Sequence, residues 1–329
     1  MQIAKAVVLA GDCRGSAPWP SVGLEARQLA PVANRPVLFH HLDALTSAGV
    51  REAAIVTDAT TRASIREAVG HGSEWGLDLT HIEDDGTPNV LASAPVADFV
   101  GSAPVLVHHG DVLLRERLTA LENDFADHEL DALILRPCSG APGEPTRASA
   151  GYIIGPYVHP SLRREAGALD DALTRLRAAG ARIGVREVDA CMPCRGGADA
   201  LLEANRRMLE QLGADQRGEL IFDSELQGPV ALHATAEVRA SVVRGPVAIG
   251  ARARIANAYI GPYTSIGADV DLDCVEIEHS IVFDRVQIRF LDSRVEGSVV
   301  GPGARVTRDF RVPRALRLSI GKDAQVSLA

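Results

Sequence analysis

Short apolar runs alternate, along the first part of the chain, with stretches in which apolar residues recur at helical spacing. The runs at residues 6–9, 53–57 and 105–109 have the length and β-branched content of buried strands. The second pattern, which is clear at residues 38–48, predicts amphipathic helices. Strands that alternate with helices predict an α/β fold with a mostly parallel, doubly wound sheet.

The pattern changes after residue 215. Apolar residues then recur at one fixed interval in three series, which are Leu232, Ile249, Ile266 and Phe283; Val238, Ile255 and Leu272; and Val243, Ile260 and Ile277. Three apolar positions per interval, with glycines nearby, predict a three-sided coil of the left-handed parallel β-helix type. We therefore expect two domains, at residues 1–215 and 216–329.

Charge and composition exclude several classes of partner. The formal net charge is -9, and the arginines are spread along the chain without basic blocks, which argues against nucleic acid. No apolar run is long enough to span a bilayer, and the N-terminus enters a predicted strand without a signal-peptide pattern. These features predict a cytoplasmic protein with no membrane partner.

A loop of small residues and glycines follows the first predicted strand. Gly11 and Gly15 let backbone N–H groups approach an anionic ligand closely, but Asp12 adds a negative charge and Cys13 adds a thiol. Ligands of such sheets bind at the carboxyl ends of the strands, so the loop and Asp111 are expected to share one crevice. A tight turn without a ligand is the alternative interpretation.

Four stretches of the chain resemble the long form of glucose-1-phosphate thymidylyltransferase, a sugar nucleotidyltransferase. They are residues 28–36 (QLAPVANRP), 109–111 (HGD), 201–206 (LLEANR) and 260–267 (IGPYTSIG). The resemblance covers nearly the whole chain. It implies a Rossmann-like nucleotidyltransferase domain before the β-helix, a homo-oligomer, and a sugar phosphate or sugar nucleotide as ligand.

In this family, a sugar phosphate displaces pyrophosphate from a nucleoside triphosphate at a magnesium ion that two aspartates hold. The resemblance matches the first aspartate to Asp111. Matching back from residues 201–206 places the second at Cys194, so these two residues take the catalytic positions. The implied substrate contacts are Gly11, Asp12, Arg14, Gly15, Arg27, Gln28, Asp85 and His109.

The groups that neutralise phosphate charge in the family are largely replaced here. The loop lacks the family's arginine, with Arg14 as a shifted substitute, and Arg27 keeps one positive charge. Lys5 and Lys322 are the only lysines, and the segment that carries the family's sugar-phosphate lysine is missing. Because phosphoryl-type transfer depends on positioning and charge neutralisation, we predict that thymidylyl transfer is lost.

The segment that reads the base in the family is also altered. Asp85 replaces an amide residue, and Val90 replaces a glycine. A carboxylate only accepts hydrogen bonds, whereas an amide both donates and accepts them. Recognition of thymine or uracil is therefore not expected.

Four cysteines are expected near the carboxyl ends of the strands, and they are Cys13, Cys138, Cys191 and Cys194. Thiolates with a carboxylate or histidine suit zinc or an iron–sulfur cluster better than magnesium. We hypothesise a soft-metal site that consists of Cys13, Cys191, Cys194 and Asp111. A reactive dithiol and inert packing are the alternatives.

Three functional classes follow from these residues. The first is an enzyme of sugar or natural-product metabolism whose crevice has been repurposed. The second is a catalytically dead homologue, which regulates or scaffolds an active nucleotidyltransferase. The third is a diverged but active sugar nucleotidyltransferase that uses Arg14 and Arg27.

Overall fold

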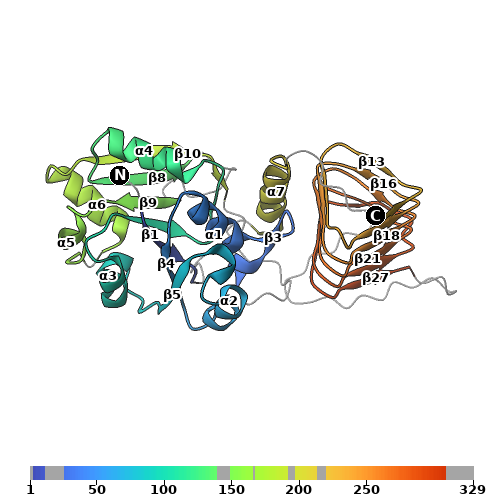
Figure 1. The fold of residues 1–329 in the computed structure, drawn as a ribbon, viewed down its shortest axis with the longest axis horizontal. Helices are drawn as coiled ribbons and strands as arrows, with labels where there is room; N and C mark the ends of the chain where they lie inside the picture. The colour runs from blue at the N-terminus through green and yellow to red at the C-terminus, as the bar shows by residue number, and fades with distance from the viewer. Residues whose placement is uncertain are drawn as a thin grey trace. The chain divides into compact units, whose positions relative to one another are not determined.

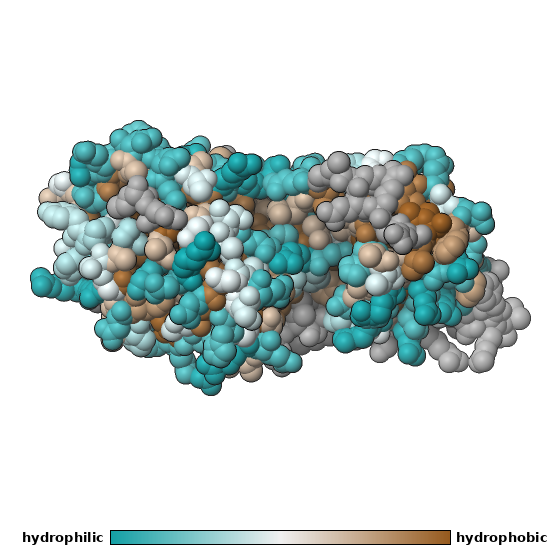
Figure 2. Space-filling view, in the orientation of Figure 1, coloured by the Kyte–Doolittle hydropathy of each residue, from teal (hydrophilic) through white to brown (hydrophobic). Residues whose placement is uncertain are grey.

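The computed structural model describes residues 3–11, 26–138, 149–165, 167–191, 197–212 and 220–308. These residues form two compact units (Figure 1). The first unit contains residues 3–11, 26–29 and 37–191, and the second contains residues 30–36 and 197–308. No helix in the described ranges is long and apolar enough to cross a membrane. On the face drawn in Figure 2, hydrophobic surface gathers mainly over the second unit.

The described residues of the first unit build a seven-stranded sheet. Its order is β10 (Ile183–Val188), β8 (Ala132–Pro137), β9 (Gly151–Ile154), β6 (Val105–His109), β1 (Lys5–Leu9), β4 (Glu52–Thr57) and β5 (Asp78–Glu83). All neighbours are parallel except β9, which is antiparallel to both β6 and β8. The predicted α/β sheet is thereby confirmed.

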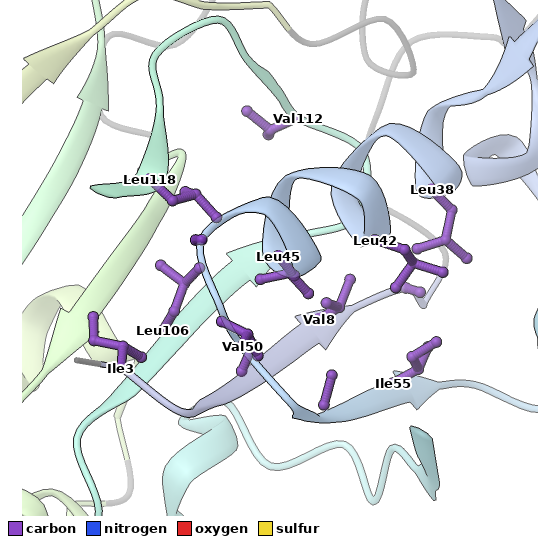
Figure 3. Packing of buried hydrophobic residues seen from close by; sticks show 14 of the residues in the cluster. Ile3, Val8, Leu38, Leu42, Leu45, Val50, Ile55, Leu106, Val112 and Leu118 are labelled. Carbon is purple, nitrogen blue, oxygen red and sulfur yellow. The ribbon is translucent and has the colours of Figure 1, made fainter. Parts of the chain in front are cut away.

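Helices cover both faces of this sheet. They are α1 (Val37–Ser47), α2 (Arg62–Val69), α3 (Ala94–Val100), α4 (Leu118–Asp127), α5 (His159–Leu162) and α6 (Leu169–Ala178), with 3-10 turns η1 (Arg27–Leu29), η2 (Ser73–Trp75) and η3 (Val90–Ala92). Successive strand residues point to opposite faces. Val8 accordingly packs against Leu42 and Leu45 of α1 (Figure 3), whereas Val7 belongs to the cluster under α3 and α6.

Three parallel sheets make up the β-helix of the second unit. The first contains β12 (Leu220–Phe222), β15 (Glu237–Arg239), β18 (Arg254–Ala256), β21 (Asp271–Asp273), β24 (Gln287–Arg289) and β27 (Arg305–Thr307). The second contains β13 (Glu225–Gln227), β16 (Val242–Arg244), β19 (Tyr259–Ile260), β22 (Glu276–Glu278) and β25 (Val295–Glu296). The third contains β14 (Val230–Leu232), β17 (Val247–Ile249), β20 (Thr264–Ile266), β23 (Ile281–Val282) and β26 (Val299–Val300). This architecture confirms the predicted left-handed β-helix.

The strand register agrees with the predicted apolar series at all positions but one. The series through Val238 and the series through Val243 each occupy neighbouring strands. In the third series, Val282 and not Phe283 stands beside Ile266. The coil between β20 and β23 is one residue shorter than the coil before it, so extrapolation of a constant interval misplaces this position.

Helix α7 (Gly197–Leu209) and a hairpin of β2 (Pro31–Val32) and β3 (Arg35–Pro36) pack on the β-helix. Asn205 is fully buried, and its Oδ1 accepts hydrogen bonds from the Ala33 N–H, at 2.8 Å, and from the Ser265 hydroxyl. Its Nδ2 donates to the Tyr263 carbonyl at 3.0 Å. The domain boundary after residue 215 stays a prediction, and the compact units count these two elements with the β-helix.

Candidate functional site

The parallel strands end at the same side of the sheet, and we call this side the carboxyl edge. They include β1, β4, β5, β6 and β8. The first residues after β1 are held there by three hydrogen bonds. The Ala10 N–H donates to the Val56 carbonyl at 2.7 Å, and the Thr61 hydroxyl donates to the Ala10 carbonyl at 3.0 Å. Gln28 donates from Nε2 to the Gly11 carbonyl at 2.8 Å. The buried Gln28 side chain thus shapes the start of the loop that the sequence analysis singled out.

A carboxylate that sequence reasoning missed lies beside Gly11. A Cβ atom placed on Gly11 would lie 3.3 Å from Oδ2 of Asp58, so the glycine permits this approach. The Asp58 carboxylate is held by the backbone N–H groups of Thr60 and Thr61, at 2.8 and 2.9 Å. The signal was available, because Asp58 directly follows a predicted strand. It places a carboxylate beside the loop where a phosphate cradle was predicted.

Asp111 lies at the same edge. The Gly110 N–H donates to the Leu9 carbonyl at 2.8 Å, and a Cβ on Gly110 would approach that carbonyl oxygen to 3.0 Å. This close contact between β6 and β1 places Asp111 next to the start of the loop. Asp111 is buried, with 1% of its surface exposed.

Two buried histidines lie behind Asp111. The ring centroids of His41 and His108 are 4.6 Å apart. Burial, together with the neighbouring His40, lowers the pKa of His41 to about 4. Burial and the neighbouring His41 likewise lower the pKa of His108, and the Asp111 charge opposes both shifts. Both rings are therefore neutral at physiological pH, and His109 is the less buried histidine of its strand end.

Asp85 is exposed in the loop after β5, where its carboxylate accepts the Thr87 N–H at 2.9 Å. The pKa of Asp85 is held below its ordinary value, mainly by a hydrogen bond from the Thr87 side chain and next by the one from the Thr87 N–H. The loop is anchored by the buried Asn89, which accepts the Leu91 N–H at 3.1 Å and donates to the Leu162 carbonyl at 2.7 Å. Asp85 thus presents a fixed, acceptor-only group.

The predicted cysteine cluster is only partly described. Cys191 lies on β11 (Ala190–Cys191), which pairs with β7 (Leu113–Leu114), and Cys138 is exposed after β8. Asp12, Cys13, Arg14, Gly15 and Cys194 lie outside the described residues. Within the described ranges, no three His, Cys, Asp or Glu side chains are grouped so that they could hold a metal ion. The soft-metal site stays a prediction.

Comparison with known proteins defines the class of this chain. Residues 5–142 match the model of the nucleotidyl transferase family. Over 98% of this chain and the whole of the relative, the sequence is 31% identical to the low-salt glycan biosynthesis nucleotidyltransferase of Haloferax volcanii. The chain therefore belongs to the nucleotidyl transferase family.

Within that family, the chain is similar to glucose-1-phosphate thymidylyltransferases, as its motifs implied. The enzyme of Streptomyces griseus is 30% identical over 99% of both chains. A crystal structure described as a glucose-1-phosphate thymidylyltransferase of Bacillus anthracis, in complex with sucrose, superposes with a TM-score of 0.54 at 17% identity. That match covers 64% of this chain and 97% of the other, and it shows the shared fold.

Proposed function

We propose that this protein binds a sugar phosphate or a sugar nucleotide at the carboxyl edge of its sheet and no longer transfers a thymidylyl group. The observation that carries the proposal is the absence of any lysine between Lys5 and Lys322. A reaction that gathers the charge of a triphosphate and a sugar phosphate needs cations for neutralisation.

Pyrophosphate release tests the loss of transfer. The purified chain is incubated with each common nucleoside triphosphate, a panel of sugar 1-phosphates and magnesium, and the Streptomyces griseus relative is assayed in parallel as a positive control. We expect no steady release from this chain, whereas titration calorimetry detects binding of a sugar phosphate or sugar nucleotide. Steady release above the blank would refute the proposal.

A second candidate is a diverged but active sugar nucleotidyltransferase. The full-length similarity to the Haloferax volcanii nucleotidyltransferase favours it. Such an enzyme would need Arg14 and Arg27 as its cations, so Arg27→Ala would abolish any pyrophosphate release. The exposed Arg66 supplies a matched control, because Arg66→Ala removes an equal charge from α2.

We also propose that Cys13, Cys191, Cys194 and Asp111 bind a soft-metal centre in place of magnesium. This centre is either a zinc ion or an iron–sulfur cluster. The pairing of Cys191 with Leu113 supports this, because it brings the cysteine backbone beside the chain that follows Asp111. Thiolates prefer such metals to magnesium.

Elemental analysis of the protein purified without chelator tests the metal proposal. We expect zinc or iron at about one site per chain. The variant Cys191→Ser should lose the metal, whereas the control Cys274→Ser, which alters a cysteine of the β-helix, should keep it. Protein that contains neither zinc nor iron would contradict the proposal.

The cellular setting and the assembly belong to the same proposal. We infer a cytoplasmic homo-oligomer that acts in sugar or natural-product metabolism. Leu220, Phe222, Phe290 and Val306 support the oligomer, since these large apolar side chains of the β-helix are exposed in one chain. Light scattering after size-exclusion chromatography tests it, and a monomeric mass at micromolar concentration would contradict it.

A further inference from the structure

Three polar side chains meet where β9 begins, and none of them has a role in the site described above. Ser149 and Tyr152 are buried, each with 4% of its surface exposed, and Asp170 lies partly exposed in the first turn of α6. The Tyr152 hydroxyl donates to Oδ2 of Asp170 at 3.0 Å. The Ser149 hydroxyl donates to the Tyr152 oxygen and lies 3.4 Å from the same Oδ2. This chain of hydrogen bonds fixes the Asp170 carboxylate.

The cluster stands at the carboxyl edge of the sheet. The residue after Ser149, Ala150, donates its N–H to the Leu135 carbonyl of β8 at 2.7 Å and accepts the His109 N–H of β6 at 3.4 Å. Tyr152 pairs directly with Val107. Because Val107 and His109 share one face of their strand, Tyr152 and Asp170 lie on the His109 side of the sheet.

The Asp170 carboxylate keeps one oxygen that the described residues leave unused. Its Oδ2 receives the contacts from Tyr152 and Ser149, whereas none of the residues described in the structure donates a hydrogen bond to its Oδ1. A carboxylate oxygen only accepts hydrogen bonds, and its bond with a hydroxyl group is short and strong. Oδ1 is therefore suited to a hydroxyl of a ligand at this edge.

We propose that Asp170 recognises one hydroxyl group of the bound sugar, with Tyr152 and Ser149 as positioning residues. This inference rests on the proposed function, because it needs a sugar-bearing ligand at the carboxyl edge. The buried tyrosine makes the contact selective, since a carboxylate held in one orientation cannot turn to follow a displaced hydroxyl. A site built to bond a hydroxyl discriminates strongly against the analogue that lacks it.

Titration calorimetry of the full chain tests the inference. The probes are glucose, galactose and mannose 1-phosphates and the monodeoxy analogues of the tightest binder. For the unaltered chain, we expect one deoxy analogue to bind at least about tenfold more weakly than its parent. Asp170→Asn reduces that ratio to about threefold or less, and Asp171→Asn, on the exposed side of the same helix turn, leaves it unchanged.

Tyr152→Phe gives an independent test, because it removes only the hydroxyl that holds Oδ2. We expect it to reduce the discrimination between the same two sugars while the thermal midpoint stays near that of Asp171→Asn. Equal discrimination by the unaltered chain and Asp170→Asn would overturn the role of Asp170 and leave the proposed function standing. An unaltered chain that binds no sugar phosphate and no sugar nucleotide would overturn both.

Discussion

Two histidine side chains near Asp111 make the stability of the first unit depend on pH. His41 and His108 are buried against each other, and burial holds both pKa values below that of a free histidine. An unfolded chain binds a proton at each histidine near pH 6.5, whereas folded His41 binds one only near pH 4. The unfolded state therefore holds more protons between these values, and stability falls as pH falls through that window.

The expected loss attributable to His41 is about 2 kcal/mol of unfolding free energy between pH 7 and pH 5. Urea denaturation at the two pH values measures it. His41→Phe keeps an aromatic ring in the site but removes the titration, so its pH-dependent loss is smaller by about that amount. His71→Gln, at an exposed histidine, serves as the control and should lose as much as the unaltered chain. A full loss in His41→Phe would show that another group is responsible.

Among the elements, α7 depends on small residues of the β-helix. Ala248 and Ser265 are neighbours in the register of β17 and β20, and the Ser265 hydroxyl donates to Asn205 of α7. Both side chains are buried, yet neither belongs to the hydrophobic core of the β-helix. The small Ser265 side chain lets α7 approach β20 closely, as dense packing requires, and the buried Ala248 stands next to Ser265 in the register.

A larger side chain in this row should force α7 away from the sheet. Ala248→Leu is expected to destabilise the second unit by about 2 kcal/mol through overpacking. Ala256→Leu adds the same three carbon atoms at a partly exposed position of β18. We expect it to lower the free energy of unfolding by less than about 0.5 kcal/mol. Chemical denaturation, followed by circular dichroism, compares the two. Equal losses would argue against close packing of α7 at Ala248.

For the whole molecule, the compact units do not follow the order of the chain. Residues 30–36 lie between segments of the first unit in sequence, yet they join the second unit. Asn34 donates to the Ile266 carbonyl at 2.7 Å, and Ala33 donates to Asn205. The second unit is therefore incomplete without a segment from the beginning of the chain.

A fragment that ends at residue 212 should expose the apolar side of α7. Leu201, Leu202 and Leu209 are buried in the full chain, and the β-helix that α7 packs against would be missing. We expect stronger binding of a hydrophobic dye by this fragment than by one that ends at residue 191, which lacks α7. Weaker or equal dye fluorescence would show that α7 finds another partner.

Local pattern was sufficient to predict the regular elements. The apolar runs at residues 6–9, 53–57 and 105–109 correspond to β1, β4 and β6, and helical spacing at 38–48 corresponds to α1. The β-helix could be predicted from the constant interval between its apolar residues. The prediction was wrong only at Phe283, because the coil before it is one residue shorter. The placement of Gly11 and Asp111 at one edge followed from the parallel topology.

The remaining features depend on contacts between residues far apart in the chain. The sequence by itself contains the strand pattern, the repeat and the missing lysines, because each of these is a property of local order or of composition. The neutral His41–His108 pair, the Asp58 carboxylate beside Gly11 and the Tyr152–Asp170 contact exist only in the folded chain. Their chemistry arises from burial and proximity, which no local pattern encodes.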